Sequence, residues 1–351
     1  MARSTIAALA CALACLAPGG AAAAAATGQT LIVEGAGDGH GVGMSQDGAL
    51  GYAEHGWSDA QILAHYYTGT TLGQAPAGAT IKVLDGSRVL KLALERYVRG
   101  VVAAEMPSSW PLAALEAQAI ASRTYALTTD VGGSRFDVYS DTRSQVFRGA
   151  AAETASSNAA VAATAGQVVE YHGQPVSTYY FASSGGMTED NENSFIGSTP
   201  QPWLRGVPDA YEGRSADWRV SIGFATAASR LAGLVRGSLR GIEVLRRGVS
   251  PRIVAAEVLG TRGDVQVSGP ELEARLGLQS AWAYFSVRAG GRVVREPDLS
   301  GQRGFAPPAP EAPPSTTSPA ATPTGATTPQ GGTPAPSPAT SASATGGAPA
   351  F

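Results

Sequence analysis

The chain has few of the residues that build covalent cross-links and metal centres. Among its 351 residues are two cysteines, Cys11 and Cys15, and both lie in an apolar N-terminal stretch. Once that stretch is removed, the chain has no thiol for a disulfide or a thiolate metal site. The four histidines, at positions 40, 55, 65 and 172, lack the paired spacing typical of metal ligands. We therefore expect no metal and no cofactor.

The chain also lacks a strong charge bias and a long internal apolar run. Lys and Arg number 25 and Asp and Glu number 28, which gives a net charge of −3 with no basic cluster. We therefore expect no nucleic-acid partner. Beyond the N-terminus no apolar segment is long enough to cross a bilayer, so we expect no membrane span in the mature protein.

Both ends of the chain have the composition of segments outside a folded domain. Residues 1–26 combine Arg3, an apolar run and small residues that offer an Ala-x-Ala cleavage site, which predicts a secretory signal peptide and a location outside the cell membrane. Residues 300–351 are dominated by Pro, Ala, Thr, Ser and Gly and predict a disordered tail. The intervening residues 27–299 predict one α+β domain of β-hairpins with a two-helix insert.

The two-helix insert spans residues 94–127. In its first helix, Leu94, Val98 and Val101 have helical spacing, and Glu105 continues the same apolar stripe. Pro107 should end that helix, because it disfavours helical backbone at the preceding residue. We expect Ser108 or Ser109 to cap the second helix. On the polar side, the spacing of Glu95 and Arg99 predicts an ion pair within the first helix.

A carboxyl group in an apolar stripe has two interpretations. Glu105 could pair with Arg123 or another cation and hold the two helices together, which is the commoner cause of such sites. Alternatively it is a general acid, since apolar surroundings disfavour the charged form and raise the pKa. Periodicity by itself leaves both interpretations open.

Several other segments have clear local patterns. Within residues 35–73, glycines alternate from Gly35 to Gly43, which suits a loop wrapped against a ligand or another strand. Asp85-Gly86 predicts a hairpin leading into the Glu105 helix. Helical spacing continues over residues 224–239, and a three-stranded meander is expected over residues 242–268.

Three motifs resemble the SpoIID/LytB family of cell-wall proteins. The family pattern of Glu-Met-Pro followed by Trp-Pro and Arg-Thr-Tyr matches at Glu105–Pro107, Trp110–Pro111 and Arg123–Tyr125. Its Gly-His-Gly-Val-Gly-Met-Ser-Gln motif matches at residues 39–46, and its Ser-Ser-Gly-Gly motif at residues 183–186. In sporulation members the histidine motif follows the Glu motif, whereas here it precedes it. We therefore expect a permuted order in one fold, with residues 35–73 packed near Glu105.

The resemblance implies a lytic transglycosylase in which Glu105 is the catalytic residue. Some members bind zinc after this region, but this chain has Ser140, Arg143 and Ser144 there, so the zinc site is not carried over. The remaining candidates are for substrate binding: Arg123, Gln145, Ser183, Ser184, Gly185, His40 and Gln46.

Alternatives stay open for several of these candidates. His40 could polarise substrate or hold the glycine loop by hydrogen bonds. Ser183 and Ser184 could bind a sugar or satisfy the backbone of a tight turn. Trp203 and Trp218 would suit stacking on a sugar ring if a face is exposed, although tryptophan is usually buried.

The expected partner is therefore the peptidoglycan glycan strand, cleaved between MurNAc and GlcNAc with formation of 1,6-anhydro-MurNAc. The alternative from a different class is a non-catalytic wall-binding module that enhances an N-acetylmuramoyl-L-alanine amidase. Such a module would keep a groove that binds the cell wall but would not need Glu105.

Overall fold

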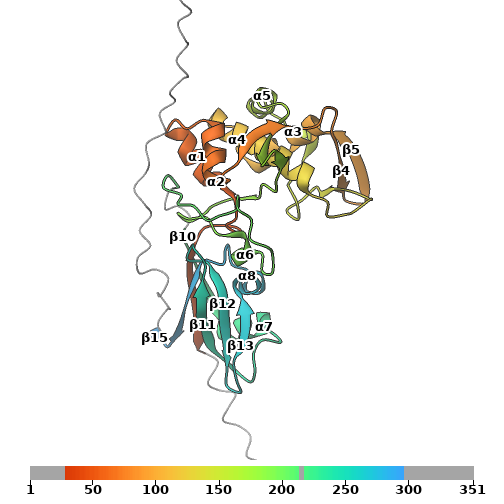
Figure 1. Cartoon of the computed structure of the whole chain (residues 1–351). Helices are drawn as coiled ribbons and strands as arrows, with labels where there is room; N and C mark the ends of the chain where they lie inside the picture. The colour runs from red at the N-terminus through yellow and green to blue at the C-terminus, as the bar shows by residue number, and fades with distance from the viewer. Residues whose placement is uncertain (1–27, 213–216, 296–351) are drawn as a thin grey trace, which may run out of the picture. The chain divides into compact units, whose positions relative to one another are not determined.

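The computed structural model describes residues 28–212 and 217–295. These residues combine helices with several small sheets, which confirms the predicted α+β class (Figure 1). The predicted signal peptide and tail lie outside the described residues. Buried apolar side chains form two main clusters, and the first contains Val101, Val102 and Met106, the close neighbours of Glu105 along the chain.

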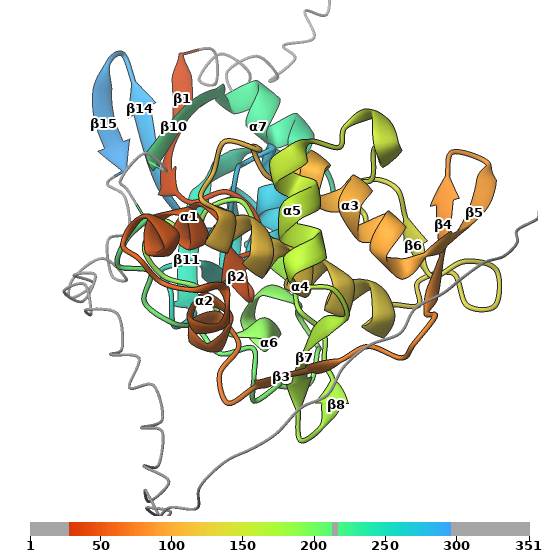
Figure 2. The same ribbon diagram turned by 90° about the horizontal axis from the view of Figure 1, so that it is seen from above.

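The helix α4 is the centre of the first cluster. Its buried residues lie on all sides, as expected for a helix inside a core, and they include the polar side chains of Gln118, Ser122, Arg123 and Thr124. Many of these residues are alanines, which allow neighbouring helices to approach closely. Figure 2 shows the helices that surround α4. The helices of this group are α1 (Gln46–Glu54), α2 (Asp59–Tyr66), α3 (Leu94–Glu105), α4 (Leu112–Thr128) and α5 (Ala155–Ala163).

The helix α3 has the predicted amphipathic pattern and ends where predicted. Leu94, Val98 and Val101 are buried, and Met106 has extended backbone at φ −125° and ψ 142°, just before Pro107. The predicted capping of α4 by Ser108 or Ser109 is wrong. Pro111 stands at the N-cap position, and no side chain there accepts a capping hydrogen bond. The rigid proline ring sets the helical entry instead.

Short strands surround these helices. The segment containing the alternate glycines is tied to the Ser-Ser-Gly-Gly segment because β2 pairs with β9 in parallel. The predicted hairpin at Asp85-Gly86 is confirmed. The strands of this group are β2 (Met44–Ser45), β3 (Thr71–Gln74), β4 (Thr80–Asp85), β5 (Arg88–Ala93), β6 (Val138–Tyr139), β7 (Gln167–Tyr171), β8 (Gln174–Pro175) and β9 (Tyr180–Phe181).

The second cluster lies between a four-stranded sheet and the meander. The sheet has the strand order β10-β1-β14-β15, and β11, β12 and β13 form the predicted meander. Its strands are β1 (Gln29–Ala36), β10 (Asp217–Gly223), β11 (Leu239–Arg247), β12 (Ile253–Gly260), β13 (Val265–Ser268), β14 (Ala283–Ala289) and β15 (Arg292–Arg295). Its helices are α7 (Phe224–Arg230) and α8 (Gly269–Leu276), while α6 (Asn191–Ser194) belongs to the connection between the two clusters.

The helix predicted over residues 224–239 is too long. The helix α7 ends at Arg230, and Gly233 and Gly237 follow with φ of 88° and 81°. These left-handed conformations cannot continue a right-handed helix, so the chain turns and enters β11.

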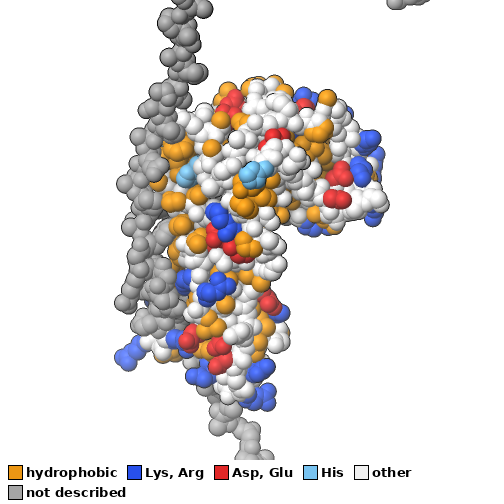
Figure 3. All heavy atoms as spheres, viewed as in Figure 1, with side chains coloured by type: hydrophobic (Ala, Val, Ile, Leu, Met, Phe, Trp, Pro, Cys, Tyr) orange, Lys and Arg blue, Asp and Glu red, His pale blue; other side chains and the backbone are white. Residues whose placement is uncertain are grey.

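On the face in Figure 3, basic and acidic side chains are interspersed and neither sign forms a broad patch. None of the helices within residues 28–212 and 217–295 combines the length and the apolar character needed to cross a membrane.

Candidate functional site

Glu105 is the last residue of α3, and its side chain is partly buried. Its Oε1 atom accepts a hydrogen bond of 2.6 Å from the backbone N–H of Val146. Because Met106 turns away from the helix before Pro107, the carboxyl group stands at a helix end where neighbouring segments converge. The structure therefore fixes one carboxyl oxygen with a donor that carries no charge.

Burial raises the pKa of the Glu105 carboxyl group above its ordinary value of 4.5, although hydrogen bonds from Val146, Gln46 and Tyr180 act in the opposite direction. A carboxyl with a raised pKa keeps its proton closer to neutral pH, as a general acid requires. Within the described ranges no Lys, Arg or His forms an ion pair with Glu105. The interpretation of Glu105 as an ion-pair residue is therefore wrong for the cations that the structure describes.

Arg123 has a different partner from the one considered for it. Its Nε and Nη2 atoms each lie 2.8 Å from an oxygen of Glu95, and Nη1 donates to the carbonyl of Gln167 at 3.0 Å. The side chain is 0% exposed, so it presents no surface to a ligand in this structure. The predicted Glu95–Arg99 pair is also wrong, since Arg99 lies 3.5 Å from Glu153 instead.

Gln145 lies in the core beside Glu105. Its amide nitrogen donates to the Tyr97 hydroxyl at 3.1 Å and to the Ser122 carbonyl at 3.3 Å. Its amide oxygen accepts a 2.8 Å hydrogen bond from the Tyr180 hydroxyl. Gln145 is 1% exposed, so it positions the following residue, Val146, rather than lining an open surface.

Tyr180 is a site residue that the sequence reasoning missed. Its hydroxyl lies close enough to Glu105 to lower the pKa of that carboxyl group. Burial, followed by the charge of Glu105, raises the pKa of the Tyr180 phenol well above its ordinary value, so it stays a hydrogen-bond donor. Tyr180 stands three residues before the Ser-Ser-Gly-Gly motif, but nothing in that motif indicates that the Tyr180 hydroxyl lies beside Glu105.

Gln46 brings the glycine-containing segment to Glu105. It is the first residue of α1, and its amide nitrogen lies 3.4 Å from the Glu105 carbonyl oxygen and 3.3 Å from Gln118 Oε1. Ser45 caps this helix by accepting from the Gly48 N–H at 3.1 Å. The segment therefore packs against the Glu105 region, as expected for the permuted order.

His40 holds the glycine loop. Its Nδ1 atom accepts from the Val42 N–H at 3.0 Å, and its carbonyl accepts from the Ser194 hydroxyl at 2.7 Å. Burial, with a contribution from Arg252, lowers the pKa of the imidazole to about 4. The ring is therefore neutral near neutral pH, and its contacts agree with the loop-holding alternative.

Ser183, Ser184 and Gly185 surround a carboxylate of the chain itself. Both serine hydroxyls donate to Glu212. The backbone N–H groups of Ser184 and Gly185 donate to the same carboxylate at 2.7 and 3.0 Å, and the Ser45 hydroxyl donates at 2.9 Å. Burial raises the pKa of Glu212, but these hydrogen bonds outweigh burial and the net pKa is lowered. No pattern in the sequence indicated that Glu212 would lie at this site.

Ser140, Arg143 and Ser144, which stand where the resemblance places zinc ligands, take part in ordinary hydrogen bonds or an ion pair. Ser140 Oγ donates to Asp85 at 2.9 Å, and Ser144 Oγ accepts from the Tyr139 N–H at 3.1 Å. Arg143 pairs with Asp141 at 2.7 Å. Across the part of the chain that the structure describes, no group of three or more His, Cys, Asp or Glu residues is placed to hold a metal ion.

The fold and this site define an α+β domain with one polarised carboxyl group, and comparisons with known proteins show what it is similar to. Residues 85–171 match the family model SpoIID, described as stage II sporulation protein. This match and the relatives below support the resemblance of this chain to the SpoIID/LytB family.

Three relatives illustrate this similarity. An uncharacterized protein of Brachyspira hyodysenteriae is 38% identical over 122 residues, which are 34% of this chain and 33% of the relative. Stage II sporulation protein D of Bacillus subtilis is 27% identical over 230 residues, 60% of this chain and 65% of the relative. The amidase enhancer of Bacillus subtilis is 37% identical over 103 residues, 29% of this chain and 14% of the relative. The matches thus span between about a seventh and two thirds of these relatives.

Proposed function

We propose that this chain is a secreted lytic transglycosylase that cleaves peptidoglycan glycan strands between MurNAc and GlcNAc. Glu105 is its catalytic acid and base. The observation that carries the proposal is a partly buried carboxyl group with a raised pKa, held by an uncharged N–H donor and free of an ion pair with the described cations.

The reaction needs one carboxyl group. Protonated Glu105 gives its proton to the glycosidic oxygen while the bond to C1 breaks and positive charge develops on the ring. The resulting carboxylate then takes the proton from the 6-hydroxyl of the same muramic acid residue, and that oxygen attacks C1. The product is 1,6-anhydro-MurNAc, and Glu105 is returned to its protonated form. No water is consumed, so no second carboxylate is needed to position one.

The residues around Glu105 have supporting roles in this proposal. Val146 holds the carboxyl group through its N–H. Gln145 precedes Val146 in the chain and accepts a hydrogen bond from the Tyr180 hydroxyl, which orients Tyr180 beside the carboxyl group. Gln46 holds the end of α3 through the Glu105 carbonyl. Arg123 stabilises the helix pair and is not proposed to touch substrate.

The experiment is a digestion of purified glycan strands, with and without stem peptides, followed by mass analysis of the products. We expect 1,6-anhydro ends from the wild type and a loss on the order of 10²–10⁴-fold for Glu105→Gln, the usual scale for a general acid. Glu54→Gln on the exposed face of α1 is the matched control and should retain activity. Absence of anhydro product from the folded wild type would overturn the proposal.

The second candidate is an amidase enhancer, favoured by the similarity to the Bacillus subtilis protein of that name. In this alternative the chain binds the wall and stimulates a separate amidase. It predicts release of stem peptides by an added amidase that rises equally with wild type and Glu105→Gln. The same two proteins therefore distinguish the candidates.

A further inference from the structure

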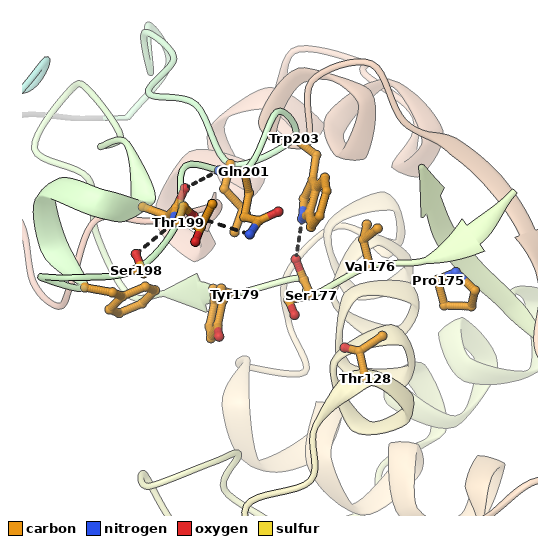
Figure 4. A pocket seen from close by; sticks show the side chains of 12 residues that line it. Thr128, Pro175, Val176, Ser177, Tyr179, Ser198, Thr199, Gln201 and Trp203 are labelled. Carbon is orange, nitrogen blue, oxygen red and sulfur yellow. Dashed lines mark hydrogen bonds between the residues drawn. The ribbon is translucent and has the colours of Figure 1, made fainter. Parts of the chain in front are cut away.

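A pocket of ≈ 670 Å³ lies next to the segment that carries Tyr180 (Figure 4). Residues from the end of α4, the segment after β8 and the loop after α6 form its wall. The residues that matter for its chemistry are Thr128, Ser177, Tyr179, Phe195, Gln201 and Trp203.

The wall of this pocket is fixed by hydrogen bonds. Trp203 Nε1 donates to the Ser177 carbonyl at 3.0 Å, which holds the indole in place. The Asn191 amide nitrogen donates to Ser198 and Thr199, both at 2.9 Å, and its amide oxygen accepts from the Gln201 N–H at 2.8 Å. A preformed wall reduces the ordering that binding would otherwise require.

The lining combines aromatic rings with uncharged polar groups. Tyr179, Phe195 and Trp203 supply the rings, and Figure 4 shows Tyr179 and Trp203 on the wall together with the hydroxyl and amide groups. Among the described lining residues there is no Asp, Glu, Lys, Arg or His. A phosphate or a peptide carboxylate would be expected to meet a cation at its site. A neutral sugar with an N-acetyl group instead presents apolar ring faces and uncharged hydrogen-bonding edges, which fit these groups.

Tyr179 and Tyr180 connect the pocket to the surroundings of Glu105. Tyr179 lines the pocket, and the next residue, Tyr180, has its hydroxyl beside Glu105. The Tyr125 ring contacts both, with ring centroids 5.9 Å from Tyr179 and 6.5 Å from Tyr180. A glycan strand is a chain of linked sugars, so a residue some distance from the cleaved bond can reach a neighbouring pocket.

We propose that this pocket is a saccharide subsite that binds one N-acetylhexosamine of the glycan strand away from the cleaved bond, with Trp203 as its stacking platform. This inference rests on the proposed function for the identity of the strand. Of the two tryptophans that the sequence offered, Trp218 is 9% exposed and donates its indole N–H to the Gly37 carbonyl at 2.9 Å, whereas Trp203 is partly exposed in the pocket.

Binding is tested first in Glu105→Gln protein, so that no turnover is required. The probe is a tetramer of N-acetylglucosamine, followed through the indole N–H resonance of Trp203 by two-dimensional NMR. We expect that resonance to shift with saturation while the resonance of Trp57, in the core and outside the pocket lining, stays in place. A free stem peptide should leave the Trp203 resonance unchanged. An unmoved Trp203 signal, or a shift with the peptide only, would overturn the subsite.

Kinetics on long glycan strands then test the role of the platform. Trp203→Ala should raise KM on the order of tenfold with kcat retained, and Trp203→Phe should restore most of the loss because an aromatic face remains. Unchanged KM in Trp203→Ala, with anhydro product still formed, would remove the subsite and leave the proposed function intact. Tetramer binding without anhydro product would remove the proposed function and keep the subsite. If Trp203→Ala fails to fold, the NMR experiment on protein that retains Trp203 decides whether the pocket binds the saccharide.

Discussion

The backbone N–H of Val146 donates a 2.6 Å hydrogen bond to Oε1 of Glu105. This bond joins the end of α3 to the loop after β6, and Gln145 fixes the same loop from inside the core. The carboxyl group is thus held by groups that carry no positive charge, and burial raises its pKa. Its environment suits a proton donor and also makes its ionisation unfavourable for the folded state.

Glu105→Gln should therefore be more stable than the wild type at neutral pH. The folded state raises the pKa of Glu105 above the ordinary value of 4.5, so above that pH ionisation favours the unfolded chain. Below it both states are protonated and the advantage of the variant should disappear. Thermal unfolding of both proteins across this pH range checks the prediction. A variant that is less stable at neutral pH would indicate that the carboxylate is stabilised by a charge.

Glu212→Gln should have the opposite effect. Its carboxylate is held by hydroxyl and N–H donors of Ser183, Ser184 and Gly185, and its folded pKa is lowered below the ordinary 4.5. The resulting stability is present above that pH and is lost as the pH falls through the folded pKa. We expect a loss of about 2 kcal/mol at neutral pH, on the scale of hydrogen bonds to a charged group. Denaturant unfolding should show that the difference shrinks in acid, and a constant difference would contradict this account.

Removing the partner of Arg123 should be strongly destabilising. In Glu95→Gln the guanidinium, which is 0% exposed while Glu95 is 36% exposed, keeps its charge without a carboxylate. Leaving a buried charged group without its partner costs about 1–3 kcal/mol or more. Glu271→Gln is the matched control, because Glu271 also lies in the first turn of a helix and pairs with an arginine at 2.9 Å, but that arginine, Arg275, is 35% exposed. Exposed pairs contribute about 0–1 kcal/mol. Equal losses in the two variants, measured by urea unfolding, would mean that Arg123 does not depend on Glu95.

The glycine loop should be sensitive to substitution where it touches another segment. Gly43 has φ of 78°, and a Cβ atom there would lie 2.1 Å from the Tyr179 carbonyl oxygen. Gly56 has φ of 83° with nothing within 4 Å, so Gly56→Ala should lose only the backbone term of about 1–2 kcal/mol. Gly43→Ala should lose more and should also disturb the neighbouring Tyr180. Thermal unfolding and activity assays of both variants check this, and equal stability would argue against the close approach.

Metal removal should change neither folding nor activity. The positions that correspond to family zinc ligands are joined to Asp85, Asp141 and Tyr139 by hydrogen bonds or an ion pair. Chelator treatment of protein purified without an affinity tag should therefore leave the unfolding temperature unchanged. A stoichiometric zinc whose loss unfolds the protein would contradict the prediction.

Patterns confined to neighbouring residues were predictable from the sequence. Three such features depend on contacts within a few residues. They are the apolar stripe of α3 that includes Glu105, the end of that helix before Pro107, and the hairpin at Asp85-Gly86. The same holds for the meander of β11, β12 and β13. The error in α7 was also local, because Gly233 and Gly237 were not recognised as a helix end.

Only the tertiary structure decided which distant groups meet. Arg123 and Glu95 are 28 positions apart in the sequence, as are Ser184 and Glu212, and nothing in their local patterns selects those partners. The pocket beside Tyr179 likewise arises from three separate segments. The sequence by itself determined that a carboxyl group would stand at the end of an apolar helix, because helical periodicity is local. Whether that carboxyl group faces a cation or an uncharged donor depends on packing between segments. In this fold, packing places the Val146 N–H against Glu105 and places Arg123 beside Glu95.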